Sequence, residues 1–230
     1  MPAANSEGKG KENFYGRRKG RPLRAGRKQL MENLLPALSV PMEAPDIDPQ
    51  SLFDSGTREI WMEIGFGNGE HLAWQAAHNP DVGLIGCEPF INGVSVLLSH
   101  VEEQALKNVR IHADDARPLL DRLPDASLTR AFVLFPDPWP KKRHAYRRFV
   151  GPENLDRLAR VLAPGAILRV ASDHPGYVVW ALRHLQAHPS FDWLAERADD
   201  WRIRPDDWPP TRYEEKALAG VPVYLTYQRV

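Results

Sequence analysis

The stretch Arg58–His78, REIWMEIGFGNGEHLAWQAAH, decides the fold. Its first half, with the apolar run IWMEI, predicts a buried strand, and its second half predicts a helix. Between them, Gly65, Gly67 and Gly69 mark a strand-to-helix turn. Such a turn lets the backbone approach a ligand closely, and open α/β sheets bind ligands at the carboxyl ends of their strands. The stretch therefore predicts the first unit of an α/β sheet with a ligand site at its end.

The same alternation of strand and helix continues along the chain. Further strands are expected at VGLIGC, NVRIHA, LTRAFVLF and AILRVAS, each followed by a helical segment. The last two strands, FDWLAER and PVYLTYQRV, are joined without a clear helix, which favours an antiparallel pair at one sheet edge. We therefore expect an α/β fold with a doubly wound, mostly parallel seven-stranded sheet, Rossmann-like, with an antiparallel C-terminal edge. Before the sheet, residues 26–39 are helical in pattern and residues 41–50 form a Pro-rich linker.

Composition places the 230-residue chain among ordinary globular proteins, with 43% hydrophobic and 26% charged residues. No apolar run approaches the roughly 18 residues that span a bilayer, so a soluble protein without membrane association is expected. The single cysteine, Cys87, excludes an internal disulfide and fits a reducing cytoplasm. We find no zinc-binding motif and expect no metal.

Charge is segregated along the chain although the net charge is zero. Residues 1–30 hold nine Lys or Arg against two Glu, which gives +7 and leaves −7 on the remaining 200 residues. We expect residues 1–26 to form a flexible basic arm and residues 27–230 to form the folded domain. Such an arm suits an anionic partner such as nucleic acid, while a solvated tail is the alternative.

Carboxylates stand at the predicted ends of the first two strands. Glu63 precedes the glycine turn, and Glu88 follows the second strand, 19 residues beyond Gly69. In this position Glu88 could accept hydrogen bonds from ribose hydroxyls. The alternative is that these carboxylates cap helices or lie in solvent.

The third strand is followed by Asp114 and Asp115. One of them could face an adenine amine, and capping of the helix that begins near Ala116 is an equal alternative for each. Several carboxylates suit a ligand without phosphates, such as S-adenosylmethionine, which carries a sulfonium and an amino group. The sequence therefore indicates S-adenosylmethionine as the cofactor.

The segment FPDPWPKKRH follows the fourth predicted strand. Its prolines exclude a regular helix or a central strand and predict a stiff loop. Asp137 would emerge beside the glycine turn and could orient a nucleobase, on which Trp139 could stack. The cations that follow would bind phosphates outside the pocket: Lys141, Lys142, Arg143, Arg147 and Arg148.

These motifs together resemble the tRNA (guanine-N7-)-methyltransferase family. EIGFGNG resembles its cofactor motif, PDPWPKKRH its hallmark loop, TRYEEKALAGVPVY its C-terminal motif, and YGRRKGRPLR the arm of some bacterial members. The resemblance covers most of residues 14–230. It implies that S-adenosylmethionine is contacted by Glu63, Glu88, Asp115 and Asp137, with Asp137 also at the active centre. It implies that RNA is contacted by Lys141, Asp173, Thr211, Arg212, Tyr213 and Glu214, whereas Tyr146 stands where the family usually has a basic residue.

The resemblance implies transfer of a methyl group from S-adenosylmethionine to N7 of a guanine in the variable loop of tRNA. Two alternatives stay open. A small-molecule methyltransferase would explain the glycine turn but not the basic clusters, and a noncatalytic RNA-binding module would leave Glu63 and Glu88 without a purpose. The sequence does not determine the oligomeric state, for which we favour a monomer.

Overall fold

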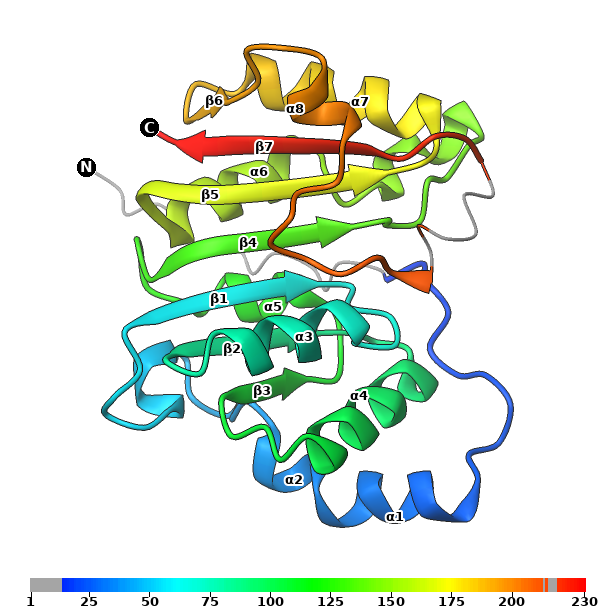
Figure 1. Ribbon diagram of the computed structural model, residues 1–230, viewed down its shortest axis with the longest axis vertical. Coiled ribbons are helices and arrows are strands. Elements are labelled where there is room, and N and C mark those ends of the chain that lie inside the picture. The colour runs from blue at the N-terminus through cyan, green and yellow to red at the C-terminus, as the bar shows by residue number, and fades with distance from the viewer. Residues whose placement is uncertain (1–13, 213, 215–218) are drawn as a thin grey trace, which may run out of the picture.

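The computed structural model describes residues 14–212, 214 and 219–230, and these form a seven-stranded sheet (Figure 1). The strands are β1 (Glu59–Ile64), β2 (Val82–Cys87), β3 (Val109–His112), β4 (Leu128–Leu134), β5 (Leu162–Ser172), β6 (Phe191–Trp193) and β7 (Val223–Arg229). Their order across the sheet is β3-β2-β1-β4-β5-β7-β6. Strand β7 runs antiparallel to both of its neighbours, whereas the pairs among β1 to β5 are parallel. The predicted fold class is confirmed.

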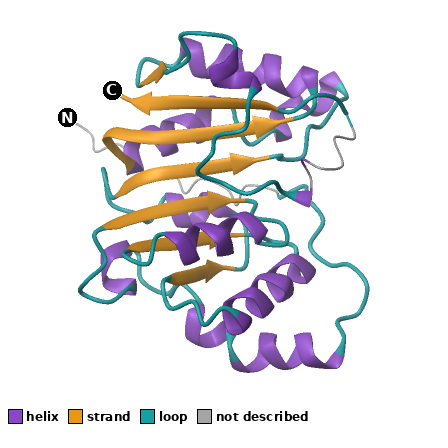
Figure 2. Cartoon of the chain, in the orientation of Figure 1, coloured by secondary structure: helices purple, strands orange, loops and turns teal. Residues whose placement is uncertain are grey.

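Helices cover both faces of the sheet (Figure 2). They are α1 (Ala25–Asn33), α2 (Leu35–Leu38), α3 (Glu70–His78), α4 (Ile91–Glu103), α5 (Ala116–Leu120), α6 (Pro152–Val161), α7 (Pro175–Ala187) and α8 (Asp199–Arg202), with 3₁₀ turns η1 (Pro49–Leu52) and η2 (Lys142–Arg147). No helix among the described residues is long and apolar enough to cross a membrane.

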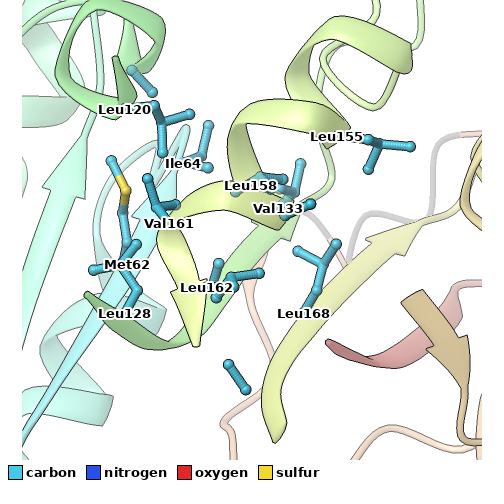
Figure 3. Close-up of a cluster of buried hydrophobic side chains, with 14 of the residues drawn as sticks. Met62, Ile64, Leu120, Leu128, Val133, Leu155, Leu158, Val161, Leu162 and Leu168 are labelled. Carbon is cyan, nitrogen blue, oxygen red and sulfur yellow. The ribbon is translucent and has the colours of Figure 1, made fainter. Parts of the chain in front are cut away.

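The two faces of β1 belong to two hydrophobic clusters, because successive side chains of a strand point to opposite sides. Met62 and Ile64 pack with Leu120 of α5 and Leu158 of α6 in the first cluster (Figure 3). Trp61 faces the other way and belongs to the cluster that α3 and α4 cover. Burial on both faces explains why the parallel strands read as nearly continuous apolar runs.

The strand order places a switch point between β1 and β4. The chain moves outward from β1 through β2 to β3 on one side, and from β4 to β5 on the other. Loops that leave the carboxyl ends of β1 and β4 therefore diverge and open a crevice. The glycine turn after β1 and the Pro-rich loop after β4 border this crevice, as the sequence predicts.

Several boundaries differ from the sequence-based expectation, and strand β6 ends at Trp193, four residues before the end of the predicted stretch FDWLAER. The segment 26–39 forms two helices, α1 and α2, and the connection before β7 contains the single turn α8. Strand β5 begins at Leu162, four residues before the predicted start, because Leu162 pairs with Leu128 of β4. Helix α6 accordingly ends at Val161.

Candidate active site

The glycine turn is held in a conformation that favours glycine. Gly65, Gly67 and Gly69 have φ angles of 74°, 58° and 78°, which side-chain-bearing residues rarely adopt. A Cβ on Gly93, at the start of α4, would lie 2.1 Å from the carbonyl oxygen of Gly67. The turn therefore packs directly against the backbone of α4.

Glu88 connects the turn to the start of α4. Its Oε2 accepts a hydrogen bond from the Gly67 N–H and its Oε1 accepts one from the Phe90 N–H, both at 2.8 Å. The pKa of Glu88 is raised to about 7, chiefly by burial and also by the nearby Asp137 and Glu63 carboxylates, against the lowering effect of these two N–H donors. A cationic or hydroxyl-donating ligand would relieve this crowding of carboxylates.

A cavity of about 420 Å³ opens between the glycine turn and the Pro-rich loop. This volume lies in the range of small-molecule sites. Of the predicted site residues, the cavity is lined by Glu63, Gly65, Gly67, Glu88, Asp115, Asp137 and Thr211. The structure therefore brings these seven residues to one cavity, although they come from five separate segments of the chain.

Glu63 is 2% exposed and forms a buried pair with a residue that the sequence reasoning missed. The Nδ1 atom of His71 on α3 lies 2.7 Å from Glu63 Oε2. The side-chain nitrogen of Gln75, one turn later, lies 3.2 Å from His71 Nε2 and donates to the carbonyl oxygen of Asp207. Trp208 packs edge-on against the His71 ring. The pair thus connects Glu63, at the cavity, to the segment that precedes Thr211.

Asp114 and Asp115 have different partners. Asp115 caps α5 by accepting from the Arg117 N–H, and it pairs with the Arg117 guanidinium at 2.5 Å. Asp114 pairs with Arg18 at 2.7 Å. Both line the cavity. The capping interpretation thus fits Asp115, and the choice of the residue that faces the adenine stays a prediction.

Asp137 lies on the wall of the cavity and is exposed as a whole residue, but partial desolvation of its carboxyl group raises its pKa above the ordinary value. The loop around it is strained, because Phe135 and Trp139 have φ angles of 49° and 41°. Positive φ at such bulky residues costs on the order of 1–3 kcal/mol each and persists only where the surroundings enforce it.

Arg148 holds the Trp139 side of this loop and is not a surface phosphate contact. Arg148 is only 9% exposed. Its guanidinium donates to the carbonyl oxygens of Pro138, Trp139 and Gly176 at 2.9, 3.2 and 3.3 Å. It also lies 5.1 Å from the centroid of the Trp180 ring. The expectation that Arg148 grips phosphate was therefore wrong, because its hydrogen bonds are directed inward to the loop that carries Asp137.

Comparisons with known proteins identify the chain. A family model described as "Putative methyltransferase" matches residues 57–224. The chain is 54% identical over 222 residues to a tRNA (guanine-N(7)-)-methyltransferase of Rhodospirillum rubrum, covering 94% of this chain and 87% of the relative. It is 55% identical over 220 residues to the protein of the same name from Paramagnetospirillum magneticum, covering 94% and 92%.

The chain belongs to the tRNA (guanine-N7-)-methyltransferase family. Its fold is also found in the solved structure of an rRNA methylase from Streptococcus thermophilus, with a TM-score of 0.52 and 10% identity over 75% of this chain and 87% of that one. At this identity the structural likeness shows the fold alone.

The basic N-terminal segment lies against the candidate site in the part that the structure describes, from residue 14 onward. The carbonyl oxygen of Arg18 accepts from the Ile91 N–H at 3.0 Å. Asn92 accepts from the Gly20 N–H and donates to the Arg21 carbonyl oxygen, both at 2.7 Å. Phe14, Tyr15, Gly16 and Arg17 line the cavity, a position that the sequence reasoning did not anticipate.

Of the described residues predicted to contact RNA, Thr211 lines the cavity and the others lie on the segments that follow β4, follow β5 or precede β7. Lys141, which immediately precedes η2, and Arg143, which lies within it, are exposed. Asp173 follows β5 and accepts from the Ala219 N–H at 3.0 Å. Arg212 is exposed, and Tyr213 lies outside the described residues. Gly69 caps α3 and does not line the cavity, so its contribution is the turn itself.

Glu214 has structural partners in the same segment. Its N–H donates to Thr211 Oγ1 at 3.2 Å, and its carboxylate accepts from Tyr224 at 2.6 Å and pairs with Arg204 at 3.0 Å. These contacts position Thr211 at the cavity wall. Among the described residues, no group of three or more His, Cys, Asp or Glu side chains is arranged to hold a metal ion.

Proposed function

We propose that this protein transfers a methyl group from S-adenosylmethionine to N7 of a guanine in the variable loop of cytoplasmic tRNA. The observation that carries the proposal is the convergence of Glu88 and Asp137 on one cavity in a chain that is more than 50% identical to relatives named for this activity. The proposal treats residues 1–26 as an RNA-binding arm and residues 27–230 as the methyltransferase domain.

The cavity fits S-adenosylmethionine by its donor and acceptor set. The glycine turn allows close approach of the methionine portion, and Glu88 retains lone pairs for the ribose hydroxyls beyond its two backbone partners. Glu63 and Asp115 would hold the cofactor from either side of Glu88. When bound, S-adenosylmethionine supplies a methyl group on a cationic sulfur that becomes neutral on transfer.

Asp137 would stabilise and orient the purine. The methyl transfer itself requires no proton transfer. The N7 lone pair forms the new bond to carbon while the carbon–sulfur bond breaks, so the positive charge passes from sulfur to the purine. A carboxylate beside the base stabilises this charge and orients the ring. Positioning of the two reactants by the rigid loops supplies much of the remaining rate enhancement.

Methylation mapping tests the proposal directly. Unmodified tRNA is incubated with the protein and methyl-labelled S-adenosylmethionine, and the labelled nucleotide is located by nuclease digestion and mass spectrometry. We expect 7-methylguanine in the variable loop. Label on a small molecule but never on tRNA would favour the small-molecule methyltransferase, and the absence of cofactor binding by calorimetry would favour the noncatalytic RNA-binding module.

The affinity for S-adenosylmethionine should fall as the pH drops through about 7. Glu88 has a pKa of about 7 in the free protein, and only its ionised form accepts from both ribose hydroxyls. Below that pH the ligand must displace a proton, so the dissociation constant rises up to tenfold per pH unit and binding releases a proton. Calorimetry between pH 5.5 and 8.5 measures both effects.

Glu88→Gln is the matched variant for this measurement, because it keeps the shape of the side chain but does not titrate. The variant should bind S-adenosylmethionine about 10- to 100-fold more weakly at pH 8, from the loss of charged hydrogen bonds worth about 1.5–3 kcal/mol. It should also lose the pH dependence below 7. An equal pH dependence in both proteins would assign the titration to another group.

The exposed cations of the arm should set the salt dependence of tRNA binding. Lys19, Arg21 and Arg24 are exposed. Replacing all three with glutamine should lower the slope of log affinity against log salt by about 2, since each phosphate contact contributes roughly 0.7–0.9. Cofactor affinity should stay constant, because Phe14–Arg17 at the cavity are retained. Filter binding over a salt series gives the slope.

Lys107, Arg183 and Arg202, replaced together, provide a control with the same change in net charge. All three are exposed on other surfaces of the domain. If the control lowers the slope as much as the arm variant does, the effect reflects net charge and the arm is a solvated tail.

A further inference from the structure

Two aromatic rings and a guanidinium gather at the mouth of the cavity. The Tyr15 and Tyr146 rings meet edge to face, with centroids 5.7 Å apart. The guanidinium carbon of Arg147 lies 4.2 Å from the Tyr15 centroid, 5.4 Å from that of Tyr146 and 4.9 Å from that of Trp139. All four residues line the cavity that also contains Asp137.

This cluster is unusual for its exposure. Tyr146 is 64% exposed and Tyr15 is 41% exposed, and they are the two aromatic residues among the exposed large hydrophobic residues of the described chain. Scattered exposed apolar residues are ordinary, but two rings brought together from segments 131 positions apart form a patch that calls for a partner. Arg147 adds the flat cationic surface that nucleobases stack on.

The charged residues around this cluster indicate which kind of partner would bind there. Lys141, Lys142 and Arg143 are exposed on the same loop and favour a polyanion. Asp137 marks the place of the reacting base inside the cavity, so a base at the mouth belongs to an adjacent nucleotide. A guanine can enter an enclosed pocket only when it is separated from its neighbours, and the unstacked neighbour then needs a new stacking surface.

We propose that Tyr15, Tyr146 and Arg147 form a stacking platform for the base of the nucleotide next to the target guanine. This inference rests on the proposed function, because it takes the tRNA guanine as the base beside Asp137. The platform is assembled from the arm and the η2 turn, so it forms only when the arm lies across the cavity mouth. The arm therefore contributes a ring to base recognition in addition to its charges.

A thermodynamic cycle between protein and RNA tests the platform. Wild-type protein and the Tyr15→Ala/Tyr146→Ala variant are assayed with intact tRNA and with tRNA carrying one abasic nucleotide on the 5′ or the 3′ side of the target. For the wild type, kcat/KM should fall about 10- to 100-fold at one of the two abasic positions, the range expected for loss of one stacked base. The same lesion should cost the variant less than threefold, because the stacking surface is already gone.

Two further variants separate stacking from other effects. Tyr146→Phe keeps the ring face and should recover most of the loss seen for Tyr146→Ala, whereas loss of a hydroxyl hydrogen bond would affect both equally. Ile203→Ala removes an exposed apolar side chain elsewhere and should behave as wild type. Equal penalties of the abasic lesion in wild type and variant, at both positions, would overturn the platform while leaving the methyl transfer intact. Absence of any methylation of intact tRNA by the wild type would refute the proposed function and the platform with it.

Discussion

Replacing Asp137 with alanine should reduce single-turnover methyl transfer to tRNA by about 10²–10³-fold, the size of effect seen when a preorganised group that stabilises transition-state charge is removed. Positive charge moves onto the purine during the reaction, and Asp137 is the carboxylate that the loop after β4 presents to the cavity. The side chain is exposed and has no core contacts to lose, so the melting temperature should change little.

The Asp137→Asn variant keeps the shape of the side chain but removes its negative charge, so it distinguishes charge stabilisation from hydrogen bonding. If the carboxylate acts by stabilising the cationic purine, the asparagine variant should remain close to the alanine variant in rate. If it acts mainly by orienting the base through a hydrogen bond, the asparagine variant should recover a large part of the rate. Rapid-quench measurement with labelled cofactor gives both rates, and near-normal transfer by a folded alanine variant would remove Asp137 from the reaction centre.

The sheet could be predicted from the sequence because burial leaves a direct trace in the residue pattern. All six residues of β2 are buried, and VGLIGC is accordingly apolar or small throughout. The order of strand and helix then places Glu63, Glu88 and Asp137 at one edge without further information. The start of β5 was less visible, because Leu162 is equally compatible with the end of a helix and the start of a strand.

Contacts between distant segments account for what the sequence did not reveal. Arg148 stands in a run of basic residues that is typical of a solvated surface, whereas its guanidinium donates to the carbonyl oxygen of Gly176, 28 positions later. Tyr15 meets Tyr146 only because the arm folds back over α4. The pairing of His71 with Glu63 could have been predicted. His71 and Gln75 are polar residues four positions apart on the buried side of α3, the helix that follows the strand of Glu63.

Replacing Arg148 with methionine should slow methyl transfer about 100-fold and destabilise the protein by about 3 kcal/mol. The guanidinium holds three carbonyl oxygens, two of which belong to Pro138 and Trp139 in the loop that carries Asp137. Methionine keeps the apolar stem beside Trp180 but removes the donors of the part-buried Pro138 and Trp139 carbonyls, at a cost of about 1–3 kcal/mol each. A displacement of about 1 Å at a reacting group is enough to cost 10²-fold in rate.

The salt dependence of tRNA binding distinguishes this positioning role from phosphate binding. Arg148→Met should leave the slope of log affinity against log salt unchanged, whereas Arg143→Met, at an exposed position five residues earlier, should lower it by about 0.7–0.9. Arg148→Lys restores the charge but not the planar fork that reaches several carbonyls at once, so it should recover little of the rate. A slope lowered equally by Arg148→Met and Arg143→Met would mean that Arg148 leaves the loop to bind RNA, and a full recovery of rate by Arg148→Lys would show that charge alone positions Asp137.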